Sequence, residues 1–353
     1  MKLHLTAPGY VRILIFLLLS GWLLQGCMTP DKDNSAVDSG SITTHLDKVK
    51  EDLDPLTFQA PVPFSESTQE YFRYYGLEVD GAEHIFGTFN ASDKILAAHI
   101  FKAKESRGTV ILLHGYGDHT GVWKHVINAM VEERYTVAVY DHPGHGLSSG
   151  ARASIADFSE YVAGLKNFLR IVRGHLPGPY HLVAHSMGGA VTLDYLLTAE
   201  QPGVEKVVLI APLVHSSYWH LSRFGHYLGK HVTDSVPRAS QNASSDEEYL
   251  MFTEEDPLLA RRVAMKWFSA LVEWNQRILS YEPSTLPIRV IQGTADTAVD
   301  WEYNVTFIKE KFLNAEIIFI ENGGHQLMNE PLPMRAKVID LVVDYLNGTV
   351  EQQ

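Results

Sequence analysis

Short apolar runs alternate with helical patterns through most of the chain, and this alternation limits the possible folds more than any other feature. Runs such as Thr109–Leu113 and Lys206–Ile210 are apolar at nearly every position, as expected for strands buried on both faces. Repeated strand–helix units predict a mostly parallel sheet of eight strands, covered by helices on both faces. The expected strands are Tyr71–Val79, Ile95–Phe101, Thr109–Leu113, Tyr135–Tyr140, Tyr180–Ala184, Lys206–Ile210, Ile288–Ile291 and Glu316–Ile320. The expected helices are Val122–Glu133, Ile155–Arg173, Gly188–Thr198, Glu302–Phe312 and Met334–Leu346.

The alternation stops between the sixth and seventh expected strands. The stretch from Pro212 to Pro283 is rich in aromatic residues and helix formers, and no buried strand is evident in it. We therefore expect one domain over residues 55–349, with a helical cap inserted at about 213–284. Such an insertion would lie over the carboxyl ends of the strands, where open α/β sheets place their sites.

The N-terminus has the pattern of an export signal that ends at a cysteine. Lys2 and Arg12 precede the apolar run Ile13–Leu19, and Gly26-Cys27 follows it. This pattern resembles a bacterial lipoprotein signal, in which residues 1–26 are removed and Cys27 is lipidated. The alternative is an uncleaved membrane anchor over 11–24, near the lower limit of length for a spanning helix.

A polar stretch separates this signal from the expected domain. Residues 27–54 show little apolar periodicity and predict a flexible tether between a lipid and the folded body. The residue after the cysteine is Met28 rather than the aspartate that retains such proteins at the inner membrane. The resemblance therefore implies a lipid-anchored protein of the cell envelope, with the outer membrane favoured.

The charge balance excludes some partners. The formal net charge is −13, and an acidic surface repels phosphate backbones, so we expect no nucleic-acid binding. Cys27 is the sole cysteine, so an intrachain disulfide is impossible.

The segment Ala184-His-Ser-Met-Gly-Gly189 lies between an expected strand and an expected helix. A sharp turn at this place exposes the hydroxyl of Ser186, which is the arrangement of a nucleophile elbow. Small residues are needed two places before and after the serine, and Ala184 and Gly188 supply them. Ser186 is therefore the predicted nucleophile.

A serine hydroxyl needs a base, and the base needs a carboxylate that fixes its tautomer. His325 follows the last expected strand, and Asp296 follows the strand before it. The order serine, aspartate, histidine is the one expected when an elbow of this kind carries a triad. Asp300 is the rival acid, although its position before Trp301 is typical of a helix cap.

The loop after Thr109–Leu113 supplies the expected oxyanion hole. Its sequence is His114-Gly-Tyr-Gly-Asp-His119, and Gly115 and Gly117 allow the backbone to approach closely. The amides of Tyr116 and Met187 are the two predicted donors to the developing negative charge.

Three motifs together resemble the monoacylglycerol lipase and lysophospholipase branch of the α/β-hydrolases, which borders on serine aminopeptidases. They are His114–Gly121, Asp141–Ser148 and His185–Gly189. The resemblance covers roughly residues 70–346 and implies hydrolysis of a lipid monoester, with no metal or organic cofactor. Ala184, which stands in place of the usual first glycine, is a departure, and the sequence does not reveal the oligomeric state.

Other interpretations of the same residues stay open. Asp141, His142 and His145 suit a structural loop better than a zinc site. Acidic cap residues keep a serine aminopeptidase possible, and a catalytically silent binding lipoprotein is a further alternative. These acidic residues are Asp246, Glu247, Glu248, Glu254 and Glu255. The cap aromatics either line an acyl-chain tunnel or pack against the core, and they are Tyr218, Trp219, Phe224, Tyr227, Trp267, Phe268 and Trp274.

Overall fold

The computed structural model describes residues 39–59, 63–238 and 243–348. The predicted signal over 1–26, the predicted lipidation site Cys27 and the first part of the predicted tether lie outside these residues. Within the described ranges, none of the helices has the length and hydrophobicity that a membrane-spanning helix needs.

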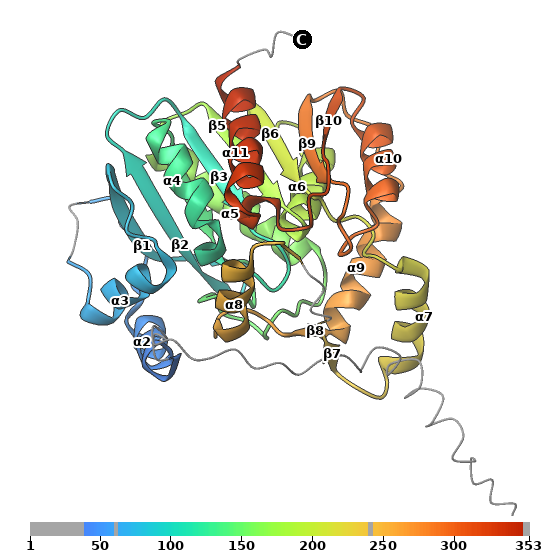
Figure 1. The fold of residues 1–353 in the computed structure, drawn as a ribbon, viewed down its shortest axis with the longest axis horizontal. Coiled ribbons are helices and arrows are strands. Elements are labelled where there is room, and N and C mark those ends of the chain that lie inside the picture. Colours follow the sequence, from blue (N-terminus) through green and yellow to red (C-terminus); the bar gives the residue numbers. More distant parts are fainter. Residues whose placement is uncertain (1–38, 60–62, 239–242, 349–353) are drawn as a thin grey trace, which may run out of the picture. The chain divides into compact units, whose positions relative to one another are not determined.

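The described part of the chain contains an eight-stranded sheet, which confirms the predicted α/β-hydrolase fold (Figure 1). The strands follow the order β1-β2-β4-β3-β5-β6-β9-β10. The pairs β1–β2 and β2–β4 are antiparallel and the other pairs are parallel. The strand bounds are β1 Ala82–Ala91, β2 Lys94–Ala103, β3 Thr109–Leu113, β4 Thr136–Tyr140, β5 Tyr180–His185, β6 Lys206–Ile210, β9 Ile288–Gly293 and β10 Ala315–Ile320.

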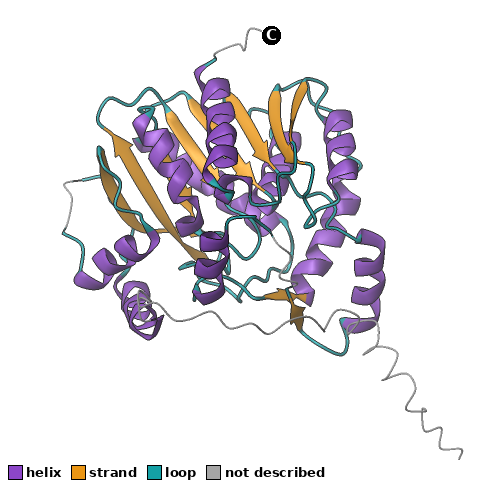
Figure 2. Ribbon diagram, in the orientation of Figure 1, coloured by secondary structure: helices purple, strands orange, loops and turns teal. Residues whose placement is uncertain are grey.

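Helices cover both faces of this sheet, as Figure 2 shows. Side chains of a strand alternate between the faces, so Val110 and Leu112 of β3 pack with α4 and α11, while Ile111 and Leu113 pack with α5 and α6. Burial on both faces explains why the central strands are continuous apolar runs. The helices around the sheet are α4 Lys124–Glu132, α5 Ser159–His175, α6 Met187–Thr198, α10 Trp301–Lys311 and α11 Leu332–Asn347, with short 3₁₀ helices η1 Thr120–Trp123 and η2 Leu327–Asn329.

The first predicted strand is wrong. Residues Glu66–Tyr75 form helix α3, and the first strand of the sheet is Ala82–Ala91. Ser65 caps the start of α3 by accepting the amide of Thr68, and Gly76 ends the helix in the left-handed conformation at φ 64°. These two caps define a helix, whereas the aromatic residues between them favour a strand.

The predicted flexible tether is wrong over its last part. Residues Ser39–Asp52 form helix α2, which packs against α3. Ile42, Leu46 and Val49 are buried, and their spacing places them on one stripe of a helix. A covered apolar stripe makes this segment part of the folded domain.

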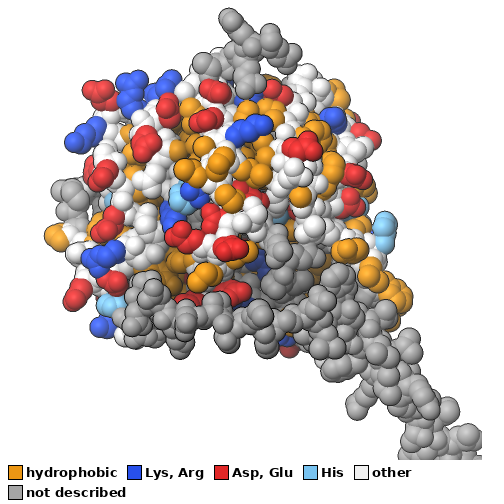
Figure 3. Space-filling model, in the orientation of Figure 1, with side chains coloured by type: hydrophobic (Ala, Val, Ile, Leu, Met, Phe, Trp, Pro, Cys, Tyr) orange, Lys and Arg blue, Asp and Glu red, His pale blue; other side chains and the backbone are white. Residues whose placement is uncertain are grey.

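The described residues of the predicted cap over 213–284 form three helices and one small antiparallel pair of strands. The elements are α7 Trp219–Gly229, β7 Ser235–Pro237, α8 Glu247–Glu255, β8 Arg262–Ala264 and α9 Met265–Ile278. The helices α7 and α9 lie in contact. On α7, Leu221, Phe224 and Tyr227 are exposed, and apolar side chains gather at the lower right of Figure 3, where this helix lies.

Candidate active site

Four loops converge at the carboxyl ends of parallel strands. Ser186 follows β5, Asp296 follows β9, His325 follows β10, and Tyr116 follows β3. Because these strands run in the same direction, their carboxyl ends meet at one edge of the sheet. The topology therefore brings together side chains that lie up to 209 positions apart in the sequence.

Ser186 lies at a strained turn between β5 and α6. Its backbone has φ 50° and ψ −113°, a conformation that residues with a side chain rarely adopt. The turn is fixed on both sides, because the Ser186 amide donates to Ile210 O at 3.0 Å and its carbonyl accepts the amide of Leu213 at 3.0 Å. Such strain persists only where the surrounding structure fixes it, as at a nucleophile elbow.

Different contacts restrict the size of the side chain at positions 184 and 188, on either side of Ser186. A Cβ added to Gly188 would lie 2.4 Å from the carbonyl oxygen of Leu113, so glycine is required there. Ala184, in contrast, is a fully buried strand residue that pairs with Leu113 and Leu209. Its methyl group fits the core, which explains how alanine replaces the usual glycine.

A chain of hydrogen bonds joins the three predicted catalytic residues. Nε2 of His325 is 2.9 Å from Oγ of Ser186, and Nδ1 of His325 is 2.8 Å from Oδ2 of Asp296. All three side chains are buried. This arrangement allows a hydroxyl proton to pass to an imidazole that a carboxylate orients.

Asp296 is held by more than its histidine. Its Oδ1 accepts the amides of Ala298 (2.8 Å) and Val299 (3.2 Å), and its Oδ2 also accepts Nε2 of Gln292 at 3.2 Å. Burial works to raise the pKa of the Asp296 carboxyl, but His325 and the two amides outweigh it and hold this pKa below its usual value. Asp296 is therefore ionised at neutral pH.

The rival acid Asp300 has the predicted structural role. It is the N-cap of α10, and its side chain accepts the amide of Tyr303 at 3.3 Å. No hydrogen bond or ion pair connects Asp300 with His325 among the described residues.

Of the two predicted oxyanion donors, Met187 directly follows Ser186, and Tyr116 follows β3, the strand that pairs with β5. Met187 is the first residue of α6, where a helix leaves amides without an intrahelical partner. Neither the Tyr116 nor the Met187 amide donates to a carbonyl in another part of the described chain. Gly117 adopts φ 80°, and a Cβ on Gly115 would lie 2.9 Å from Nδ1 of His185, so both glycines of the loop are needed.

The motif Asp141–Ser148 holds the loop that begins at His114 in place. Oδ1 of Asp141 accepts the amide and the hydroxyl of Thr120, both at 2.8 Å, and Oδ2 accepts the Leu147 amide at 2.8 Å. The amide of His142 donates to Nε2 of His114 at 2.9 Å. Asp141 and His114 thus organise loops, and the described residues hold no group of three or more potential metal ligands.

The family model described as serine aminopeptidase, S33, matches residues 104–332, which include every residue of this site. The chain belongs to this family.

Several proteins with similar sequences are named as lipases. The chain is 26% identical to human monoglyceride lipase over 275 residues, which cover 75% of this chain and 89% of the relative. It is 35% identical to the monoacylglycerol lipase of Mycolicibacterium smegmatis over 205 residues, covering 55% of this chain and 72% of the relative. These relatives support a lipase or esterase function.

Solved structures share the fold. The monoacylglycerol lipase of Paleococcus ferrophilus has a TM-score of 0.63 at 22% identity, and the match covers 72% of this chain and 98% of that chain. A soluble variant of the monoglyceride lipase from Saccharomyces cerevisiae has a TM-score of 0.66 at 17% identity, and the match covers 82% of this chain and 99% of that chain.

The cap aromatics of this family member divide into two groups. Trp219, Trp267, Phe268 and Trp274 are buried, whereas Tyr218, Phe224 and Tyr227 are exposed. The ring of Trp267 packs against the ring of Tyr116 at a tilt of 33°, with centroids 3.8 Å apart, so a cap residue covers the side chain of Tyr116. The buried group therefore packs in the core, which is one of the two roles expected for the cap aromatics.

The acidic cap residues do not form a pocket for an amine. Glu247, Glu248, Glu254 and Glu255 lie exposed on α8, and Asp246 caps this helix by accepting the amide of Tyr249. The aminopeptidase alternative thereby loses the feature that kept it open.

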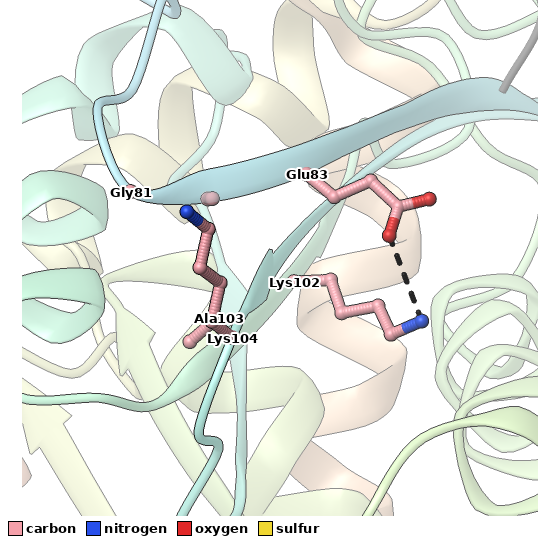
Figure 4. A pocket seen from close by; sticks show the side chains of 6 residues that line it. Gly81, Glu83, Lys102, Ala103 and Lys104 are labelled. Carbon is pink, nitrogen blue, oxygen red and sulfur yellow. Dashed lines mark ion pairs between the residues drawn. The ribbon is translucent and has the colours of Figure 1, made fainter.

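A surface hollow lies away from these residues, at the open end of the β1–β2 hairpin (Figure 4). Lys102 and Glu83 face each other across it, with Nζ and Oε2 3.6 Å apart and both side chains exposed. An exposed pair of this kind contributes little binding energy, so the hollow is a poor candidate for the reaction. Its lining consists of Gly81, Ala82, Glu83, Lys102, Ala103 and Lys104.

Several residues of the site were missed by sequence reasoning. They are Gln292, which donates to Asp296, and the buried acids Asp118, Asp256 and Glu330. For the three acids the sequence holds no spacing signal, because most of their partners come from distant parts of the chain, whereas Gln292 lies only four positions before its partner Asp296.

Proposed function

We propose that this chain hydrolyses the ester bond of monoacylglycerols through an acyl-enzyme formed at Ser186. The observation that carries the proposal is the hydrogen-bonded series Ser186, His325 and Asp296, with bonds of 2.9 and 2.8 Å. The site has the geometry that an attacking serine needs.

The reaction proceeds in two steps. His325 takes the proton of Ser186 while Oγ attacks the ester carbonyl, and the amides of Tyr116 and Met187 hold the oxyanion. His325 then returns the proton to the leaving glycerol oxygen. A water molecule, deprotonated by His325, attacks the acyl-enzyme and releases the fatty acid and Ser186.

A lipid substrate is supported by the relatives and by the surroundings of the site. The relatives are named for monoglycerides, and the contact between Tyr116 and Trp267 gives the loop after β3 an apolar neighbour. Apolar side chains near a site favour an acyl chain over a charged amino terminus.

The test is mass-resolved hydrolysis of a panel that contains monoacylglycerols, lysophospholipids, p-nitrophenyl esters and aminoacyl amides. Ser186→Ala is the control, and we expect it to lower turnover by about 10⁶-fold. Serine-dependent release of fatty acid from monoacylglycerols supports the proposal. Release from lysophospholipids alone would assign lysophospholipids as the substrate in place of monoacylglycerols. Amide cleavage alone, or no activity above the control, would contradict the proposal.

We also propose that Cys27 carries a lipid that anchors the enzyme in the cell envelope. The support is the sequence pattern around Gly26-Cys27, and an anchor would keep the site near membrane lipid at a high effective concentration. Metabolic labelling with a fatty acid, compared between the wild type and Cys27→Ala, tests this. Equal labelling or equal membrane recovery of the two proteins would rule it out.

A further inference from the structure

The loop that carries His325 is held on both sides of the histidine, on one side by a segment of the cap and on the other by Glu330. On one side, the amide of Gln326 donates to the carbonyl of Ala243 at 2.7 Å. On the other side, the amide of Gly324 donates to Oε1 of Glu330 at 2.9 Å. The backbone on either side of His325 is thus fixed by groups outside the three catalytic residues.

The Glu330 carboxylate bridges this loop and the cap. Its Oε2 accepts hydrogen bonds from the amide of Ser245 at 2.8 Å and from the hydroxyl of Ser245 at 2.6 Å, while Oε1 accepts the amide of Gly324. Glu330 is 1% exposed, and no lysine or arginine of the described residues forms an ion pair with it. A buried carboxylate without a cation is costly unless hydrogen bonds satisfy it, so these donors are what hold it in place.

The cap segment at residues 243–246 is tied down at further points. The hydroxyl of Ser244 donates to Asn329 O at 2.8 Å, and Asp246 caps α8 while lying 3.8 Å from Nη1 of Arg335. The segment cannot leave the His325 loop without breaking its bonds to Glu330.

The atoms around the Glu330 carboxylate are closely packed. A Cβ on Gly324 would lie 2.7 Å from Oε1 of Glu330 and 3.0 Å from Ala243 O. Loss of the carboxylate therefore opens space directly beside the backbone that orients His325. Nε2 of His325 has to stay within hydrogen-bond reach of Ser186, and a displacement of about 1 Å costs on the order of 100-fold in rate.

We propose that Glu330 is a positioning residue, which makes the placement of His325 depend on the docked cap segment 243–246. This inference rests on the proposed catalytic role of His325. Glu330 touches neither Ser186 nor the reacting atoms, and it acts through the loop.

Glu330→Gln is the test variant, and Glu321→Gln is its matched control. A glutamine oxygen replaces only one of the two carboxylate oxygens, so the amide nitrogen opposes the donors of Gly324 or Ser245. Glu321 lies exposed in the same loop region, and its side chain forms no hydrogen bond with the described residues. The readouts are kcat and KM for a soluble p-nitrophenyl ester, with the concentration of active sites titrated by a fluorophosphonate.

We expect Glu330→Gln to lower kcat per active site by about 10- to 100-fold with KM nearly unchanged, and Glu321→Gln to keep wild-type values. A role in folding alone would reduce the number of titratable sites and leave kcat per site intact, which would overturn the proposal. So would an equal loss in the Glu321→Gln control.

Ser245→Ala keeps the inference testable if Glu330→Gln does not fold. It removes one donor to Oε2 and leaves the backbone amide, so we expect a smaller fall in kcat per site, about two- to tenfold. In the double variant the losses should not add, because both act through one bridge. Additive losses would overturn the inference. His325→Ala distinguishes a failure of the Glu330 inference from a failure of the proposed function. Near wild-type activity of that variant would refute the proposed function itself.

Discussion

Replacing Asp296 with asparagine isolates what one carboxylate contributes to the site. Oδ1 accepts the amides of Ala298 and Val299, and Oδ2 accepts Nδ1–H of His325. An asparagine NH₂ group facing the two amides would oppose their N–H groups, so its oxygen takes the Oδ1 place and its NH₂ faces His325. Nδ1 must then accept a hydrogen bond, the imidazole proton moves to Nε2, and no lone pair remains for the Ser186 hydroxyl.

The size of the effect follows from this change of tautomer. The corresponding change in another serine triad lowers kcat by about 10⁴-fold, which equals ~5.5 kcal/mol of transition-state stabilisation. The lowered pKa of Asp296 means that the wild-type carboxylate is charged and stabilises the imidazolium as it forms, and asparagine loses this too. Substrate binding involves neither change, so we expect KM to stay within about threefold.

Steady-state hydrolysis of a p-nitrophenyl ester measures the effect, with Asp300→Asn as the matched control. Asp300 caps α10, and asparagine caps a helix about as well as aspartate, so this control should stay within about twofold of wild type. If Asp296→Asn kept more than about a tenth of wild-type kcat, the tautomer argument would fail. If Asp300→Asn lost as much as Asp296→Asn, the triad acid would have been misassigned.

Three further outcomes are expected from single substitutions. Gly188→Ala places a Cβ 2.4 Å from Leu113 O, so thermal unfolding should show a loss of about 3 kcal/mol or more, or no folded protein. Leu46→Ala should cost about 2–5 kcal/mol in urea denaturation, whereas a flexible tether would show no change. Asp256→Asn removes a buried ion pair with His119, 2.8 Å long. Burial works to raise the pKa of Asp256 and lower that of His119, but their attraction outweighs it, so Asp256 titrates below and His119 above its usual pKa. The stability that Asp256 contributes is lost as pH falls below about 4, because the carboxylate is then protonated. The stability that His119 contributes is lost as pH rises through its raised pKa, because the imidazolium then loses its proton. The difference in Tm between wild type and Asp256→Asn should therefore be largest between about pH 4 and 6.5, and a difference that is flat with pH would contradict the ion pair.

The central sheet could be predicted because its physical signal is local. Strands such as Thr109–Leu113 are buried on both faces, and a continuous apolar run records that burial directly. The N-terminal helices were misjudged for opposite reasons. In α3 the aromatic side chains favoured a strand, although the caps Ser65 and Gly76 were present in the sequence. In α2 the helical spacing of the apolar residues was present, but polar composition outweighed it.

The three residues of the predicted triad could be found because the fold links their order to strand ends. Ser186, Asp296 and His325 each follow a strand, and the parallel sheet converts that shared position into proximity. Asp300 was separable from Asp296 for the same reason, since a helix begins directly after it. The capping role predicted for Asp300 is confirmed.

The buried acids around the triad could not be found in this way. Asp256 joins three parts of the chain, because it accepts the hydroxyl of Tyr75 on α3 at 2.6 Å, the ring of His119 in the oxyanion loop, and the amide of Leu258 in the cap. Glu330 likewise joins the His325 loop with the cap. In the sequence each is one acidic residue among many. The two carboxylates lie where the cap meets loops of the catalytic domain, so the cap is bonded to the site through buried charges as well as packed over it. Because a buried carboxylate tolerates the loss of a donor poorly, a displaced cap would disturb both the oxyanion loop and the histidine loop.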